Sequence, residues 1–240
     1  MLKSLVEIRK KILKFLTIFS PAITIFIVYF LKIDIVVFLS RFSDTLANEI
    51  KDKPNLGFTI NSAIVLIIIS LVIEFLKYPG KFEIGLENNS RKSDSYFYVR
   101  QGSDRHITVH IDCKLNYKNL FLRTFIYKLG GLSLNVEIPE WLDYKIDNEQ
   151  DLKGKILLQE KMKFQVDIDR AIQRKKVESL LYIKVLILSK SFDLNYGSII
   201  PTVEPISKKK IKRFFLYIVI WLFFDIKANN YKVEARNDIF

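Results

Sequence analysis

The chain has 240 residues, of which 50% are hydrophobic and 27% charged, and it carries a formal net charge of +12. This length allows one ordinary domain with a membrane anchor and little more. A single cysteine, Cys113, excludes an intramolecular disulfide, and with only His106 and His110 beside it a structural zinc site is not expected. The positive charge suits acidic lipid, nucleic acid or a phosphorylated ligand, or it reflects lysines on a solvated surface.

Two apolar segments near the N-terminus are long enough to cross a bilayer. Residues 15–31 form an uncharged run of seventeen residues, and residues 58–76 form a second run that contains Asn61 and Glu74. About twenty apolar residues in a helix span the hydrocarbon core. A secretory signal peptide is the rival interpretation of the first run, but no small-residue cleavage pattern follows it. We therefore expect a two-helix transmembrane hairpin over residues 1–78.

The charges beside these segments predict the orientation of the hairpin. Five basic residues and one acidic residue give the first fourteen residues a net charge of +4, whereas three basic and four acidic residues give residues 33–57 a charge of −1. Because basic loops stay on the cytoplasmic side, we expect a multi-pass inner-membrane protein with its N-terminus and everything after residue 77 in the cytoplasm. Apolar residues at helical spacing in the connector predict a helix that extends the first span or lies along the outer interface.

From about residue 82 the pattern changes to an alternation of apolar and polar residues. The clearest alternating runs are residues 106–115, 132–138 and 163–169. Residues 180–188 read as a more fully buried strand, and residues 168–181 suit a short helix. Turn signals separate the runs. Six to eight short strands predict a cytoplasmic all-β domain over residues 79–207, either an antiparallel sandwich or a small barrel.

A third apolar run lies near the C-terminus, where residues 214–226 contain one charge, Asp225, and follow a basic cluster. As a helix, thirteen residues reach only about 20 Å, which is short of the hydrocarbon core. Three interpretations are open: a segment that lies on the inner leaflet or against the other spans, buried strands of the β domain, or a third crossing. The basic cluster favours the cytoplasmic face in each of them. We expect residues 208–240 to form a basic and apolar membrane-proximal segment that ends in a strand.

Catalytic motifs are not found in the sequence. It contains no GxxxxGK[ST] phosphate loop, no GxGxxG, no GxSxG, no HExxH and no CxxC. Cys113 lies in a strand-like run without a partner base. A membrane-bound enzyme would need convergent titratable groups that the sequence does not display, so we expect no enzyme activity, no cofactor and no bound metal.

Binding residues are indicated instead by aromatic side chains beside arginine and lysine. Tyr96, Tyr98 and Arg100 share one face of an expected strand. Bases stack on aromatic rings while guanidinium groups hold phosphates, so this combination suits a nucleotide. The alternative is that the aromatic residues fill the core and the basic residues are solvated. The candidate ligand-binding residues are Tyr98, Arg100, Arg105, Arg123, Tyr127, Lys128 and Trp141.

Polar residues inside the second apolar segment are candidates for a pore or for contacts between helices. A carboxylate such as that of Glu74 is costly in lipid unless it faces a partner, water or a pore. The alternative is that Glu74 lies at the headgroup level, one turn before Lys77. Asn61, Ser62 and Ser70 can contribute contacts between helices. Two helices cannot enclose a pore, so conduction requires an oligomer.

The order of a short basic N-terminus, two spans and a cytoplasmic β domain resembles the two-transmembrane-helix plus β-barrel effectors of bacterial nucleotide-signalling anti-phage defence systems. The resemblance concerns the architecture of the whole chain and involves no specific motif. It implies that a nucleotide signal controls a membrane effector, which oligomerises or opens and impairs the inner membrane of the infected cell.

Two functions are therefore expected. The first is an anti-phage defence effector, an oligomeric ion channel or membrane-disrupting protein controlled by a cyclic nucleotide or short oligonucleotide bound to the β domain. Its partners would be the lipid bilayer and further copies of the chain, a tetramer among the options, but not duplex DNA. The alternative is a membrane-anchored protein-interaction module without pore activity.

Overall fold

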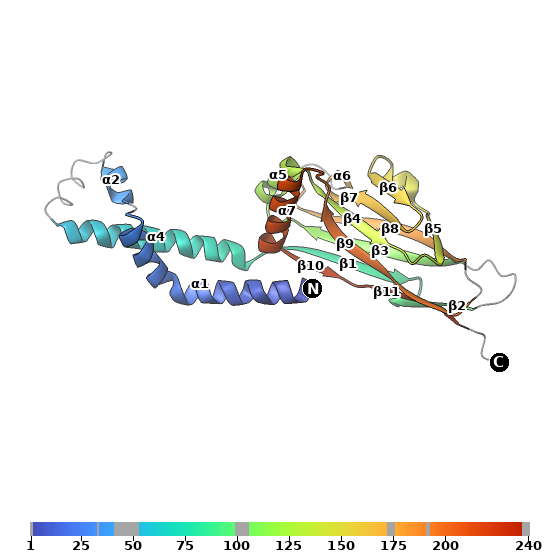
Figure 1. Ribbon diagram of the computed structural model, residues 1–240. Helices are drawn as coiled ribbons and strands as arrows, with labels where there is room; N and C mark the ends of the chain where they lie inside the picture. The colour runs from blue at the N-terminus through green and yellow to red at the C-terminus, as the bar shows by residue number, and fades with distance from the viewer. Residues whose placement is uncertain are drawn as a thin grey trace. The chain divides into compact units, whose positions relative to one another are not determined.

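A computed structural model describes residues 2–32, 34–40, 53–98, 106–171, 176–190 and 193–236 of the protein. The chain divides into two compact units, Met1–Pro79 and Gly80–Phe240. The first unit is helical, and the second, called here the β unit, is built mainly from strands (Figure 1).

The helices of the first unit are α1 (Leu2–Phe30), α2 (Ile35–Ser40) and α4 (Pro54–Lys77). Two stretches, Glu7–Phe30 and Asn55–Lys77, are long and apolar enough to cross a membrane, with mean hydropathies of 2.0 and 2.5. In the most apolar 18-residue part of each stretch only 17% and 22% of the residues are buried, so most of the side chains there are exposed or half-buried. The expected pair of apolar helices is confirmed. Part of the expected connector helix is α2, and residues 41–52 lie outside the described residues.

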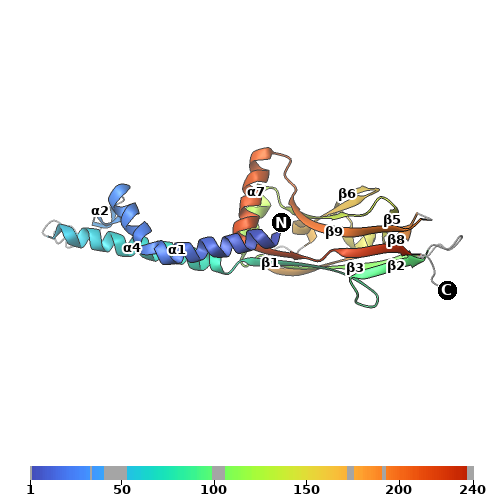
Figure 2. The ribbon, with the colours of Figure 1, turned by 60° about the horizontal axis from the view of Figure 1, so that its bottom comes forward.

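The strands of the β unit form two sheets (Figures 1 and 2). The five-stranded sheet has the order β10 (Phe224–Ala228), β1 (Gly80–Asn88), β3 (His106–Asn116), β8 (Glu178–Ser189) and β5 (Leu142–Ile146). The six-stranded sheet has the order β2 (Asp94–Tyr98), β11 (Tyr231–Arg236), β9 (Asn195–Pro205), β4 (Leu132–Glu137), β7 (Lys163–Asp167) and β6 (Ile156–Glu160). A single buried cluster draws apolar residues from both sheets, which makes the unit a sandwich rather than a closed barrel.

Two strand pairs depart from the antiparallel arrangement expected from the sequence. Strand β10 pairs with β1 in parallel, and β11 pairs with β2 in parallel, whereas the other pairs are antiparallel. In both exceptions a C-terminal strand pairs with one of the first two strands of the unit. A long connection can return the chain in the same direction, so parallel pairing is possible here but not across a short hairpin turn.

The expectation of a more fully buried strand at residues 180–188 is wrong. Strand β8 alternates: Leu181, Ile183 and Val185 lie in the core, whereas Leu180 and Tyr182 point away from it and are exposed. One face of β8 packs against the other sheet, and its second face is the outer surface of the five-stranded sheet.

Helices lie at one end of the sandwich. They are α5 (Leu120–Leu129) and α7 (Lys210–Phe223), and Figures 1 and 2 show α7 standing at the end of the sheets. Of the short helix expected at residues 168–181, the structure shows α6 (Ile168–Ala171), residues 172–175 lie outside the described residues, and residues 178–181 belong to β8 instead. Helix α5 was not predicted from the sequence, although Asn119 caps its first turn by accepting a hydrogen bond from Leu122 N.

The C-terminal apolar run of residues 214–226 is divided between a helix and a strand. Helix α7 contains it up to Phe223, and β10 begins at Phe224. The inner side of α7 is buried against the core, and the helix contacts α5, β9 and β10. Helix α7, β10 and β11 group with the β unit, and β11 is a strand near the end of the segment 208–240.

A buried carboxyl group ties the start of β4 to the end of β3. Asp169 accepts hydrogen bonds of 2.8 Å from the Tyr117 hydroxyl and from the Leu132 backbone N–H. A Cβ on Gly131, whose φ is +80°, would lie 2.7 Å from Asp169 Oδ2, so the carboxyl occupies the space that glycine leaves free. Burial raises the pKa of Asp169 above its ordinary value of 3.8, although both hydrogen bonds oppose that rise.

The raised pKa of Asp169 predicts how the stability of the β unit varies with pH. A carboxyl group with a raised pKa binds its proton more tightly in the folded state, so its contribution to stability falls as the pH rises from 3.8 through its folded-state pKa. We expect the melting temperature of the wild type minus that of Asp169→Asn to decrease from about pH 4 to neutral pH. Thermal scans of the full chain in detergent would measure it, and a difference that grows with pH would contradict the prediction.

Candidate functional site

Two of the candidate ligand-binding residues, Tyr98 and Trp141, lie at the end of the sandwich away from α5. Tyr98 is 47% exposed at the end of β2. The Trp141 ring packs edge-on against Phe97 at 6.2 Å, so the indole belongs to the edge of the core. Arg100 and Arg105 lie outside the described residues. Among the described residues, Arg236 lies 3.6 Å from the centre of the Tyr96 ring at this end.

The other three candidates lie on α5, at the opposite end of the β unit (Figure 1). The guanidinium group of Arg123 is buried, donates a hydrogen bond to the Lys176 carbonyl and lies 6.0 Å from the centre of the Tyr117 ring. Tyr127 and Lys128 are exposed on the outer side of the helix. The described candidates therefore form two separate groups and are not brought together into one nucleotide site.

Asn61 makes a contact between helices within the first unit. Its side chain is 5% exposed, and its Oδ1 accepts a hydrogen bond of 2.9 Å from the backbone N–H of Val36. Its Nδ2 donates to Asp34 Oδ1 at 2.9 Å, and the same oxygen accepts from the backbone N–H of Val37 at 3.1 Å. Asn61 and Asp34 together satisfy N–H groups at the start of α2, which have no partner within that helix.

The remaining pore candidates are exposed on α4. Ser70 lies on the exposed side of the helix. The Glu74 carboxylate lies 3.5 Å from Lys77 Nζ, and more than half of each side chain is exposed. The pair sits in the last turn of α4. Glu74 would occupy this position if it lay at the level of the lipid headgroups. An exposed ion pair at this spacing contributes little to stability.

The Asn61 contact predicts that backbone N–H groups at the start of α2 are protected from hydrogen exchange. Replacing Asn61 with alanine would leave the Val36 N–H without its acceptor, at a cost of about 1 kcal/mol. We expect hydrogen exchange in the peptide that contains Val36 to become roughly five- to tenfold faster. Ser70→Ala, at an exposed position of α4, the helix that contains Asn61, is the matched control and should leave that exchange unchanged. Equal protection in wild type and Asn61→Ala would refute the contact.

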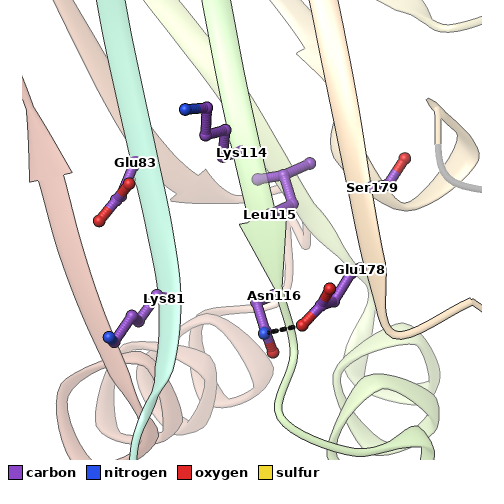
Figure 3. Close-up of a pocket in the computed structure, with 7 residues that line it drawn as sticks. All are labelled: Lys81, Glu83, Lys114, Leu115, Asn116, Glu178 and Ser179. Atoms are coloured by element: carbon purple, nitrogen blue, oxygen red, sulfur yellow. Dashed lines mark hydrogen bonds between the residues drawn. The ribbon is translucent and has the colours of Figure 1, made fainter.

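A groove lies on the outer face of the five-stranded sheet, close to the helical end of the β unit (Figure 3). It has a volume of about 570 Å³ and is lined by Lys81, Glu83, Lys114, Leu115, Asn116, Glu178 and Ser179. The strand register explains how these residues meet: Lys81, Asn116 and Glu178 form one row across β1, β3 and β8, and Glu83 and Lys114 begin the next row.

The groove presents hydrogen-bonding groups and charges of both signs. Glu83 forms an ion pair of 3.8 Å with Lys227 on β10, and Asn116 donates a hydrogen bond to Glu178. Two lysines and two glutamates alternate across the strands, an arrangement that suits a ligand carrying both charges, such as a peptide segment. Within the described residues, no group of three histidine, cysteine or carboxylate side chains is placed to hold a metal ion.

A row of outward-facing side chains runs along β8 beside the groove and is apolar except for Lys184, which forms an ion pair of 2.6 Å with Asp147. Exposed fractions are 60% for Leu180, 40% for Tyr182 and 37% for Leu188. The Tyr182 hydroxyl lies 2.6 Å from His110 Nδ1, and the two rings stack, which holds Tyr182 against the sheet. Strand β3 pairs with β8 over Glu178–Leu188, whereas β5 pairs with it only over Val185–Ser189. The exposed apolar side chains of this row are the feature that marks the face as a candidate contact surface. The sequence signal for this row was the apolar content on both faces of β8.

Cys113 does not supply a nucleophile. It lies on the core face of β3, and burial raises the pKa of its thiol to about 12. The reactive thiolate is therefore not populated at neutral pH.

No protein-family model and no curated protein matches the chain. Among solved structures, it is similar to the seventh ScaB type I cohesin from Pseudobacteroides cellulosolvens, with a TM-score of 0.33 and 9% identity over 68% of this chain and 96% of that one. It is also similar to CaCohA2 from Clostridium acetobutylicum, with a TM-score of 0.30 and 12% identity over 65% and 92% of the two chains. For the C-terminal domain of the AgI/II polypeptide BspA from Streptococcus agalactiae, the TM-score is 0.34, with 8% identity over 66% and 50%. Scores of this size carry no information on what this chain binds.

Proposed function

We propose that the protein is a membrane-anchored, non-enzymatic interaction module that binds a protein partner across the outer face of its five-stranded sheet. Helices α1 and α4 are the proposed anchor, and the β unit is the proposed binding part, on the cytoplasmic side. The observation that carries the proposal is the exposed apolar row of Leu180, Tyr182 and Leu188 on β8.

The composition of this face suits a protein interface. Interfaces combine an apolar centre, in which tyrosine is enriched, with a polar rim. Here the apolar row has Lys114 on one side, and on the other Lys145 and Asp143 on the outer side of β5. The charged groove continues the same face toward Lys81 and Glu178. A complementary partner would present an apolar segment flanked by charges of both signs.

The test is the effect of Tyr182→Ala on partner binding. Cross-linking from a photoreactive residue at position 184 in the full chain, expressed in its own cells, would identify the bound protein. Binding of that protein should weaken by about tenfold or more when Tyr182 is truncated, as expected for a tyrosine near the centre of an interface. Tyr196→Ala, an exposed tyrosine of the other sheet, is the matched control and should bind normally. If both variants bound like wild type, the proposed face would be wrong.

A regulated pore is a second proposal, and the exposed position of Glu74 on α4 favours it. Its carboxylate lies on the exposed side of an apolar helix. In an oligomer, a neighbouring copy or a water-filled path would solvate such a group. The nucleotide that would control the pore has no assembled site among the described residues, so Arg100 and Arg105 would have to contribute to it.

Membrane potential separates the two functions. We expect expression of the wild type, alone or with its neighbouring genes, to leave the inner-membrane potential unchanged, because an anchor conducts no ions. Glu74→Gln, which removes the charge but keeps the size of the side chain, should then behave identically. Depolarisation that a neighbouring gene controls and that Glu74→Gln alters would favour the pore over the interaction module.

A further inference from the structure

Helices α5 and α7, which contact each other at one end of the β unit, leave large apolar side chains uncovered. The exposed fractions reach 76% for Phe121, 73% for Ile211 and 62% for Phe214. We call the whole set the helical-end surface: it consists of Leu120, Phe121, Phe125, Tyr127, Ile211, Phe214, Phe215 and Tyr217. An exposed set of this kind on a folded unit marks a place of contact.

These side chains are not needed for the core of the β unit, because each helix already buries its other side. Leu122 and Ile126 of α5 are buried, and so are Leu216, Val219 and Ile220 of α7. A helix that is apolar on nearly all sides requires a second apolar environment besides the core. The helical-end surface therefore faces an apolar partner or lipid.

The charge around this surface favours anionic lipid over an ordinary apolar partner. Neither residues 117–131 nor residues 206–223 contain an acidic residue. The exposed basic residues of these two segments are Lys128, Lys208, Lys209, Lys210, Lys212 and Arg213. The pKa of Arg213 is raised mainly by its hydrogen bond to the Tyr217 hydroxyl, and Glu204 on β9 adds to the rise and offsets part of this charge. Large aromatic side chains with a basic surround are typical of helices that lie in the membrane interface.

The chain enters the β unit at this same end. Gly80, the first residue of β1, pairs with Phe224, which directly follows α7. Lys77, the last residue of α4, precedes Gly80 by three positions in the sequence. Three residues extend at most about 11 Å, so an inserted α4 would keep the start of β1 close to the headgroups.

We propose that the helical-end surface is a second, peripheral membrane contact, in which α5 and α7 lie in the interface of a leaflet that contains anionic lipid. Helix α7 has 14 residues and is about 21 Å long, too short to cross the hydrocarbon core. Its aromatic side chains enter the acyl boundary, while its lysines extend to the phosphate groups. This contact depends on the proposed function, in which α1 and α4 anchor the chain in the membrane. The contact would set the orientation of the β unit relative to the bilayer.

Lipid quenching of a site-specific fluorophore tests the contact in the full chain. Cys113 is buried with a raised pKa, so added cysteines at positions 121 and 214 can be labelled selectively with bimane. The labelled protein is reconstituted in vesicles of phosphatidylcholine and phosphatidylglycerol, with or without nitroxide-labelled acyl chains. Leu71→Cys on α4, 65% exposed, reports insertion of the anchor, and Tyr196→Cys, 67% exposed, is the soluble control.

We expect the nitroxide lipids to reduce fluorescence at positions 71, 121 and 214 but not at 196. Quenching at 71 without quenching at 121 and 214 would overturn the peripheral contact and leave the anchor standing. A blue shift at 214 that lipid nitroxides do not quench would also overturn it, because a second copy of the chain would then cover the surface. Loss of quenching at position 71 as well would refute the anchor itself.

A charge series separates electrostatic attraction from apolar burial. Replacing Lys209, Lys210 and Lys212 together with glutamine should reduce quenching at position 214 in vesicles with phosphatidylglycerol, because neutralising lysines near an anionic surface weakens attraction. The matched control replaces the same number of exposed lysines elsewhere in the β unit: Lys153, Lys161 and Lys232. Equal quenching in both triple variants would show that the basic cluster does not hold the surface on anionic lipid and would overturn that part of the proposal.

Discussion

The parallel pairing of β1 with β10 is the constraint on which the arrangement of the β unit depends. A Cβ on Gly80 would lie 2.7 Å from the Phe224 ring and 2.7 Å from the Asn116 carbonyl oxygen, so only glycine allows the strands to meet this closely. The pairing places the end of α7 beside the first residue of β1. From there the chain crosses to the second sheet, where β11 pairs with β2 and β9. One short C-terminal stretch thus joins both layers.

The fold was predictable from the sequence where the local pattern is strong. The two apolar helices, and the strands at residues 106–115 and 132–138, follow from run length and alternation. The division of residues 214–226 could not be foreseen, since no glycine or proline separates α7 from β10. Phe224 leaves the helical conformation because β1 provides a strand partner there, and such a partner is distant in the sequence. Helix α5 did have local signals, Asn119 before it and Gly130–Gly131 after it.

The candidate site was less predictable than the fold, because it depends on which strands become neighbours. Tyr98 and Tyr127 belong to similar aromatic and basic runs, yet they lie on β2 and α5, which Figure 1 shows at opposite ends of the β unit. Lys81, Lys114 and Glu178 are distant in the sequence, and the register of β1, β3 and β8 brings them to one groove. The exposure of the apolar row of β8 could not be predicted for a related reason, because a strand that is apolar on both faces is expected to be buried on both.

The two proposed contacts limit what kind of partner the groove can receive. Asn116 ends β3 just before α5, and Lys81 lies next to Gly80, so the groove opens beside the helical end (Figure 3). If α5 and α7 lie in the interface, a segment in the groove lies within a few residues of the lipid headgroups. A partner confined to the same membrane would meet it at a higher effective concentration than a soluble one. The basic surround would also oppose a cationic segment and favour an acidic one. The partner expected on these grounds is a membrane-bound protein whose apolar segment lies next to its own anchor and is flanked by charges of both signs with an excess of acidic residues.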